Sequence, residues 1–457
     1  MTLRRALNAV AFCAALVFPV GAFAEASSET PRAVLLFTGE QSGYLLPCGC
    51  TKGMMGGIDR RATAIKQIRA EKRPVLLVDN GGLIGGVSTQ DRIKRDILLQ
   101  AMQTMGYDVM GVGKSDLIAG LSSFLPPIED SGIQVVSSNI FYLDGRRLFS
   151  PGKIFTLDKL RVGVTAAFDP ELIEPTEPIR RELRFADPAQ ALKGVLDEWR
   201  GKVDLTVLLY HGPHAKAMDL ARELGEFDLI VSGYDNDLMV KEVGRVGRTP
   251  VVITGVKAKY LGRIDVLKGE KAVFGPVQPI ALSEDVPKEQ DMRDLMDFYR
   301  SMLKSEWGNL VTKRKKGLPD DEMYVSSHLC GTCHKAAWEK LKQEDKHFHA
   351  LETLEKDGSA WDPECVVCHV VGLEYKSGYV NKTLTRTMGH VGCDSCHGPG
   401  SAHMVKSVAE NAPKANGEKS CLQCHTLEHD PKFDYKTYWP KVEHPTPPLE
   451  KEELKKQ

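Results

Sequence analysis

Eight of the 11 cysteines in this 457-residue sequence fall into four copies of one phrase, Cys-x-x-Cys-His. The cysteines are Cys330 and Cys333, Cys365 and Cys368, Cys393 and Cys396, and Cys421 and Cys424, and the histidines that follow them are His334, His369, His397 and His425. In this phrase two thiols can add to the two vinyl groups of a haem, while the histidine binds the iron from one face. A zinc site or disulfides are the alternatives for a single copy. Four complete copies favour four covalently bound haem c groups.

The remaining histidines are concentrated in the same part of the chain. Besides the four motif histidines, those after residue 320 are His328, His347, His349, His390, His403, His429 and His444. A low-spin electron carrier needs a second strong axial ligand on each iron, and this set can supply it. We expect about half of the seven to be solvated or structural instead.

Two further cysteines, Cys48 and Cys50, stand in a Pro-Cys-Gly-Cys phrase behind the first predicted strand. A disulfide between them would close a strained, easily reduced ring. Two free thiolates could instead bind a metal or a soft substrate, and Arg60, Arg61 and a helix N-terminus would favour the thiolate form. The third alternative is a structural turn. The pair is therefore the candidate for catalytic or redox chemistry.

The elements that would position Cys48 and Cys50 belong to an α/β domain over residues 33–285. Apolar runs predict strands at Ala33–Phe37, Val75–Val78, Val109–Val112, Gln134–Val136, Val162–Ala166, Leu205–Leu209, Leu229–Val231 and Val251–Thr254. Helical patterns between them cover Arg60–Ala70, Arg92–Met105, Pro188–Trp199 and Ala215–Leu224. This alternation predicts a mostly parallel or mixed sheet with helices on both faces, and loops behind the strands as the place for chemistry.

The haem motifs follow a predicted boundary near residue 320. An amphipathic helix is expected over 288–311, and the basic run Lys313–Lys316 reads as a solvated linker. The domains would thus be 25–287, then a helix and linker at 288–322, then 323–457. After residue 325 the sequence has few strand patterns, so we expect a mainly helical and irregular segment. The buried apolar surface of this segment would come largely from the porphyrins.

The start of the chain reads as an export signal. Arg4 and Arg5 precede the apolar run Ala6–Val20 and a small-residue ending at Ala24, a pattern typical of a signal peptide over residues 1–24. An N-terminal membrane anchor is the alternative; no other stretch is apolar for long enough to span a bilayer. We expect a periplasmic protein, or one exported to the cell surface. With a net charge of −1 and no basic tail, nucleic acid is not an expected partner.

The C-terminal region, about residues 322–430, resembles the tetrahaem cytochrome c family that includes the electron acceptor of hydroxylamine-oxidising bacteria. The resemblance rests on the phrases Tyr324–His334, His347-Phe-His349-Ala350, Cys365–His369 and above all Gly389–His403. It implies packed pairs of mostly bis-histidine haems, with His349, His390 and His403 as distal ligands and His347 competing with His349. The fourth distal ligand stays open between His429, His444, His328 and a five-coordinate iron.

Residues 33–270 resemble periplasmic 5′-nucleotidases and the related thiosulfohydrolase, a metallophosphatase fold with α/β/β/α layers. The phrases include Leu35–Gly39, Gly57–Thr63 and Phe227–Gly233. That family binds two metals with Asp-x-His, Gly-Asp, Asn-His-Glu and Gly-His-x-His. Here those positions read Glu40-Gln41-Ser42, Gly81-Gly82, Lys114-Ser115-Asp116 and Gly233-Tyr234-Asp235-Asn236, and only His211 matches a ligand. We interpret the domain as a phosphatase fold whose metal site has been dismantled, because two close divalent ions need several carboxylates and imidazoles.

Two functions compete. The first is electron transfer to redox partner proteins, either other cytochromes or a periplasmic oxidoreductase. The second is an oxidoreductase in which Cys48 and Cys50, or an open haem, handle a small sulfur or nitrogen substrate. The missing ligands disfavour a third possibility, an active phosphatase fused to a cytochrome.

Overall fold

The computed structural model describes residues 31–48, 53–234, 239–268, 271–406 and 412–444, with the side chains of Cys48, Arg314 and Asp345 excepted. The predicted signal segment and Cys50 lie outside these residues. Within the described ranges, no helix has the length and apolar character needed to cross a membrane.

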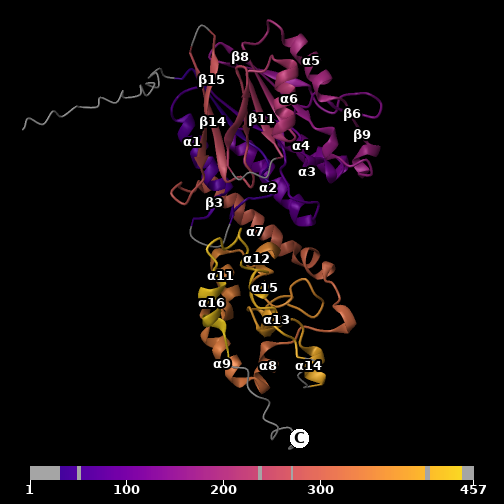
Figure 1. Cartoon of the computed structure of the whole chain (residues 1–457), viewed down its shortest axis with the longest axis vertical. Helices are drawn as coiled ribbons and strands as arrows, with labels where there is room; N and C mark the ends of the chain where they lie inside the picture. Colours follow the sequence, from indigo (N-terminus) through magenta and orange to yellow (C-terminus); the bar gives the residue numbers. More distant parts are fainter. Residues whose placement is uncertain (1–30, 49–52, 235–238, 269–270, 407–411, 445–457) are drawn as a thin grey trace, which may run out of the picture. The chain divides into compact units, whose positions relative to one another are not determined.

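Two β-sheets form the centre of the N-terminal region (Figure 1). The five-stranded sheet has the order β15 (Val273–Ala281), β14 (Tyr260–Leu267), β1 (Ala33–Thr38), β4 (Val75–Asp79) and β5 (Val109–Met110). The six-stranded sheet has the order β12 (Lys241–Val246), β13 (Thr249–Ile253), β11 (Leu229–Gly233), β10 (Leu205–His211), β8 (Leu160–Phe168) and β7 (Gly152–Leu157). The pairs β1–β4, β4–β5, β8–β10, β10–β11 and β11–β13 are parallel. The pairs β7–β8, β12–β13, β1–β14 and β14–β15 are antiparallel. Two short ladders pair β2 (Pro47–Cys48) with β3 (Met55–Gly56) and β6 (Ile140–Tyr142) with β9 (Leu183–Phe185).

The two sheets share one apolar core. Leu35 and Phe37 of β1 and Val207 and Leu209 of β10 belong to the same buried cluster. Strands covered on both faces are apolar at nearly every position, because each face must be removed from water. The apolar runs of β1 and β10 are therefore explained by burial between the other sheet and a layer of helices.

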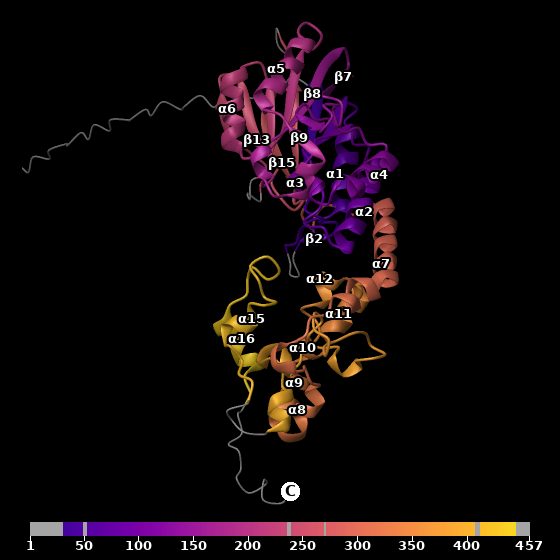
Figure 2. The same cartoon turned by 90° about the vertical axis from the view of Figure 1, so that its right-hand side faces the viewer.

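Helices cover the outer faces of both sheets. On one side lie α5 (Pro188–Trp199) and α6 (His214–Leu224), and on the other α1 (Ile58–Arg69), α2 (Thr89–Met105) and α4 (Leu121–Ser131), as Figure 2 shows. A short helix, α3 (Lys114–Ile118), follows β5, and the 3-10 turns η1 (Pro170–Leu172) and η2 (Pro178–Arg181) follow β8. The result is the α/β/β/α arrangement expected for this region.

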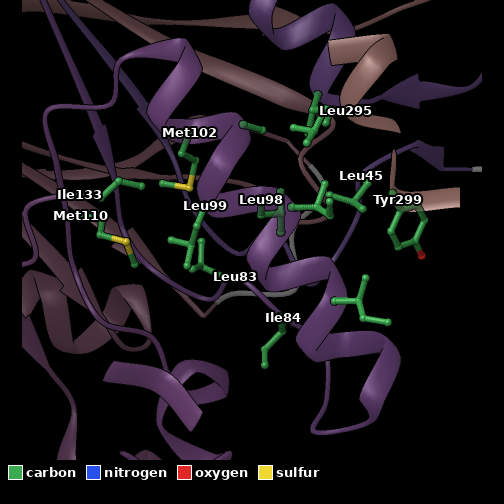
Figure 3. Close-up of a cluster of buried hydrophobic side chains, with 14 of the residues drawn as sticks. Leu45, Leu83, Ile84, Leu98, Leu99, Met102, Met110, Ile133, Leu295 and Tyr299 are labelled. Carbon is green, nitrogen blue, oxygen red and sulfur yellow. The ribbon is translucent and has the colours of Figure 1, made fainter. Parts of the chain in front are cut away.

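The longest helix, α7 (Gln290–Leu310), continues the helical layer next to α1 and α2. Figure 3 shows Leu98, Leu99 and Met102 of α2 and Leu295 and Tyr299 of α7 in one buried apolar cluster. The same cluster extends into the C-terminal part through Leu351, Leu354, Val366, Val370, Leu373 and Tyr379. The described part of the chain from residue 31 on accordingly forms one compact unit.

The C-terminal part consists of short helices and loops. They are α8 (Ser327–Cys333), α9 (Lys335–Gln343), α10 (Asp345–Phe348), α11 (Ala350–Asp357), α12 (Pro363–Val366), α13 (Cys393–His397), α14 (Ser401–Val405), α15 (Glu418–Cys421) and α16 (Tyr435–Val442), with the 3-10 turns η3 (Thr312–Arg314), η4 (Pro319–Asp321) and η5 (Arg386–Met388). No strand is assigned among the described residues after β15, as expected.

The basic segment after α7 is held to the C-terminal part. Lys315 Nζ donates to the carbonyl oxygens of Gly378, at 3.3 Å, and Tyr379, at 2.5 Å. Burial lowers the pKa of Lys315 to about 8. This lysine is docked against the loop at 372–379, which differs from the solvated linker that its charge pattern suggested.

Candidate functional site

Each Cys-x-x-Cys-His phrase lies on or beside a helical turn. The first is in α8, the third in α13, and the second and fourth begin at the ends of α12 and α15. The amides of His334 and His425 donate to the carbonyl oxygens of Cys330 and Cys421, both at 2.9 Å. Residues three and four positions apart share one face of a helical turn, so local geometry brings two thiols and an imidazole to the same side.

The motif sulfurs group in two pairs. The thiol of Cys330 lies beside that of Cys393, and the thiol of Cys368 lies beside that of Cys424. These thiols stand in for the thioether sulfurs of a haem-bound chain. None of the eight motif cysteines forms a disulfide bond. The first motif is thus next to the third, and the second next to the fourth.

Three motif histidines have their Nδ1 atoms held by an oxygen. The partners are the carbonyl of Ala350 for His369 at 2.7 Å, the carbonyl of Pro413 for His397 at 3.2 Å, and Asp430 Oδ2 for His425 at 2.9 Å. Because a carbonyl oxygen only accepts, Nδ1 of His369 and His397 must carry the proton. Nε2 then keeps its lone pair, which is the state a metal requires. These residues fit a haem iron.

Three motif histidines also face a second histidine ring. The ring centroids are 6.1 Å apart for His334 and His403, 5.9 Å for His397 and His444, and 6.2 Å for His425 and His347. A metal–imidazole bond is about 2 Å long, so two imidazoles on opposite sides of one iron have ring centroids about 6 Å apart. Each pair therefore has the separation that a bis-histidine iron needs.

Local structure sets up these pairs. Gly398 adopts φ 89°, which side-chain-bearing residues rarely adopt, and allows a sharp turn between α13 and α14. His403 on α14 thereby faces His334. Its Nδ1 is buried without a hydrogen-bond partner. Burial lowers the pKa of His334, His347 and His397, so these rings are neutral near pH 7, as iron ligands must be.

The other distal candidates lie elsewhere. His349 is the residue before α11, 43% exposed, with Nδ1 3.0 Å from Glu352. His390 is buried against Trp338 and Phe348, its Nε2 is 3.0 Å from Ser327 Oγ, and burial beside His328 lowers its pKa to about 4. His429 follows the fourth motif in a turn that its amide makes with Thr426 Oγ1 at 3.2 Å.

His369 differs from the other motif histidines. Among the described residues, no ring lies against its imidazole. Its Nδ1 is fixed by Ala350, so the ring orientation is set from one side only. The sequence could indicate that one iron lacked an obvious partner, but not which one, because distal ligands are brought in by tertiary structure.

In the N-terminal domain, His211 stands at the position where the resembling family has a metal ligand. It ends β10, and its Nε2 accepts from the amide of Lys114 at 2.9 Å. The proton therefore sits on Nδ1, which lies 3.1 Å from Glu40 Oε1. Neither ring nitrogen of the 2%-exposed His211 has a lone pair to offer a metal.

The surroundings of Glu40 are tightly filled. A Cβ on Gly82 would lie 2.8 Å from Glu40 Oε1, and one on Gly233 would lie 3.1 Å from the same oxygen. Lys114 brings a cation, with Nζ 5.9 Å from the ring centroid of Tyr234. The carboxylate of Glu40 thus occupies the space between β4, β10 and β11 where those strands end.

Asp116 serves the backbone. Its carboxylate accepts from the amides of Gly82, at 2.9 Å, Leu83, at 2.9 Å, and Gly113, at 2.8 Å. A Cβ on Gly113 would be 2.2 Å from Gly82 N, so the two loops approach as closely as glycine permits. Burial raises the pKa of Asp116 in spite of these donors. No group of three or more His, Cys, Asp or Glu side chains placed to hold a metal ion is found among the described residues.

The Cys48 hairpin is described only in part. Pro47 and Cys48 pair with Gly56 and Met55, while Cys50 and the Cys48 side chain lie outside the described residues. Arg60 Nη1 donates to the carbonyl of Met54 at 2.8 Å.

Arg61, fully buried, donates to Gln41 Oε1 at 2.6 Å and to Tyr107 Oη at 3.3 Å. The described contacts of Arg60 and Arg61 therefore support the hairpin backbone and the core.

Residues 329–398 match the family model described as cytochrome c554 and c-prime. The matched range contains the first three Cys-x-x-Cys-His phrases; the fourth lies beyond it. The C-terminal part is therefore similar to c-type cytochromes, and this similarity implies covalently bound haem c.

The N-terminal part is similar to nucleotidases. The chain is 26% identical over 322 residues to a snake venom 5′-nucleotidase of Crotalus adamanteus, covering 63% of this chain and 53% of that protein. It is 26% identical over 278 residues to the 5′-nucleotidase of Bos taurus, covering 54% and 48%. The chain thus spans about half the length of these curated relatives.

Solved structures show the same fold. A sulfate thiohydrolase SoxB from Thermus thermophilus superposes with a TM-score of 0.54 at 17% identity, covering 65% of this chain and 63% of that one. A 5′-nucleotidase precursor, also from Thermus thermophilus, gives 0.54 at 19% identity, covering 64% and 61%. The N-terminal domain is accordingly a metallophosphatase-like α/β fold.

Proposed function

We propose that this chain is an exported tetrahaem cytochrome c that passes electrons between redox partner proteins. Haem groups at all four motifs carry the electrons, and the 5′-nucleotidase-like domain supports them without phosphatase chemistry. The observation that carries this proposal is the set of three histidine pairs with ring centroids about 6 Å apart, each containing one motif histidine. His397 of the third motif is paired with His444, and His425 of the fourth motif is paired with His347.

The sulfur contacts support an arrangement of the haems in two close pairs. Cys330 contacts Cys393, which links motifs one and three, and Cys368 contacts Cys424, which links motifs two and four. The imidazoles agree, because His334 lies near both His403 and His444, while His347 lies near both His425 and His369. Haems held this closely can exchange electrons along the chain.

Loss of the metal site is supported by the state of His211 and Asp116. His211 accepts at Nε2 and carries its proton on Nδ1, while the Asp116 carboxylate is taken up by three backbone amides. Glu40 alone cannot offset the charge of two divalent ions. The domain keeps the fold of its relatives and serves as a scaffold, or as a docking surface for a redox partner.

The second candidate function is an oxidoreductase in which the haem at His369 has an open position. It is favoured by the lack of a facing ring at His369 among the described residues. A five-coordinate iron admits a small ligand. Cys48 and Cys50 remain candidates for handling a sulfur substrate under this function.

One experiment tests both functions. Mass spectrometry of the mature protein counts the haems, and carbon monoxide added to the fully reduced protein reports open irons. Four haems with no carbon monoxide binding support the pure electron carrier, and four haems with one binding site favour the second candidate. Three haems or fewer on fully matured protein contradict the proposal. Loss of residues 1–24 from that protein is the expected mark of export.

A further inference from the structure

The fourth motif differs from the others in the partner of its histidine. His425 Nδ1 lies 2.9 Å from the carboxylate oxygen of Asp430, whereas His369 and His397 bond to backbone carbonyls. A carboxylate carries a full negative charge, and a carbonyl only a dipole. The fourth site is thus electrostatically distinct.

The turn after the motif builds this contact. The amide of Asp430 donates to the carbonyl of Thr426 at 2.8 Å, which folds the carboxylate back onto the motif. Phe433, whose amide donates to the Asp430 carbonyl at 3.0 Å, stacks on the His425 ring with centroids 4.6 Å apart and 21° between the planes. The Asp430 side chain is only 13% exposed. Ring and carboxylate are therefore held together by the same short segment.

A carboxylate partner changes what an axial imidazole does to iron. It draws the Nδ1 proton toward itself, which increases the electron density that Nε2 donates. More donation and a nearby negative charge both stabilise ferric over ferrous iron. Hydrogen bonding around the axial ligand and burial are recognised means of setting haem potential, and partial burial strengthens the charge effect.

We propose that Asp430 sets the haem at the fourth motif to a lower reduction potential than the haems whose histidines bond to carbonyls. Asp430 acts through His425 and is a positioning residue. This inference rests on the proposed function, since it requires a haem at the fourth motif. With this order of potentials, an electron on the fourth haem would move downhill to the haems at the second and third motifs.

Redox titration of the intact holoprotein, followed by visible spectroscopy, tests the inference with Asp430→Asn. The matched control is Glu428→Gln, which removes one carboxylate charge from the same turn. Glu428 contacts Tyr44 Oη and Lys257 Nζ, both at 2.5 Å, and the control leaves the His425–Asp430 bond unchanged.

We expect Asp430→Asn to raise one midpoint potential, shifting that haem's one-electron equilibrium about tenfold, which corresponds to about 59 mV. Glu428→Gln should shift it clearly less. Asp430→Ser, whose hydroxyl can still accept from Nδ1, should reproduce the Asn effect, and it replaces that variant if Asn prevents haem attachment.

Four haems with unchanged potentials, or with equal shifts in Asp430→Asn and Glu428→Gln, would overturn this inference alone. A wild-type protein whose fourth motif carries no haem by mass spectrometry would instead overturn the proposed function, and the inference with it. A potential that rises in both Asp430 variants and is restored by Asp430→Glu supports the role of the charge.

Discussion

At the scale of single residues, two neighbouring histidines with the same chemistry have different surroundings. His347 faces His425 with ring centroids 6.2 Å apart, is half-buried, and has its pKa lowered by that burial. His349 is 43% exposed and bonded to Glu352. The resemblance to tetrahaem cytochromes put His349 first, whereas the geometry favours His347 as the ligand opposite His425.

Replacing each of the two with alanine distinguishes them. We expect His347→Ala to convert one haem from low-spin to high-spin, because losing a strong axial ligand weakens the ligand field of that iron. His349→Ala is the control and should leave all spectra unchanged. Electron paramagnetic resonance of the oxidised proteins measures the high-spin fraction. A high-spin signal in His349→Ala alone would reverse the assignment.

The sequence predicted the haem ligands that lie close together along the chain, but not those that are distant in sequence. The motif cysteines and histidines lie within five residues of one another, so one helical turn suffices to place them and the pattern could be read directly. Distal ligands are joined to their irons only by tertiary structure: His403 is on α14 and faces α8, and His444 follows α16 and faces α13. No local signal separates these from His328 or His390.

At the scale of elements, the junction between α2, α7 and α12 fixes the second motif. Gln90 Nε2 donates to Asp362 Oδ1 at 2.8 Å, and Tyr299 Oη lies 3.3 Å from Asp362 Oδ2. Burial and the Asp362 charge hold the pKa of Tyr299 well above its usual value, so its hydroxyl stays a donor. Asp362 also caps α12 by accepting from Glu364 N at 3.0 Å.

Asp362→Ala should therefore cost more than the loss of a cap. Truncation removes the cap of α12 and leaves Gln90 and Tyr299 without their hydrogen-bond acceptor. The two losses together lower the free energy of unfolding by about 2–4 kcal/mol. The matched control is Asp187→Ala, since Asp187 is exposed and caps α5 at Gln190 N, 2.8 Å away, with an expected loss of about 1 kcal/mol. Urea unfolding followed by circular dichroism measures both. Equal losses would mean that the junction contributes nothing beyond the cap.

The elements themselves were predictable where they are long and buried. The strands expected at Ala33–Phe37 and Leu205–Leu209 are β1 and β10, and Pro188–Trp199 is α5 to the residue. The antiparallel strands β7, β12, β14 and β15 were missed, because their partly exposed positions interrupt the apolar run. The segment at Gln134–Val136, expected as a strand, makes only isolated bridges from Val135 and Val136. The second sheet was available only through the resemblance to metallophosphatases.

At the scale of the whole molecule, the chain joins a metallophosphatase-like fold to a haem-bearing segment through a shared apolar core. Leu351 and Val366 of the C-terminal part lie in one cluster with residues of α2 and α7. Burying such side chains contributes about 1.5–3 kcal/mol each. The N-terminal domain thus has a structural reason to be retained even without catalysis, since its helices cover apolar surface of the haem segment.

The N-terminal domain should have no phosphatase activity. The intact protein should hydrolyse no nucleotide at a rate above background with Mn²⁺, Zn²⁺ or Mg²⁺ added, because His211 has no free lone pair and Asp116 is bound to three amides. Calorimetric titration with the same ions should show no tight binding at this site. The control is Glu40→Gln, which removes the last carboxylate available to a metal and should leave any background hydrolysis unchanged. A background that falls in this variant would place metal-dependent hydrolysis at Glu40 and show that the old phosphatase centre still works.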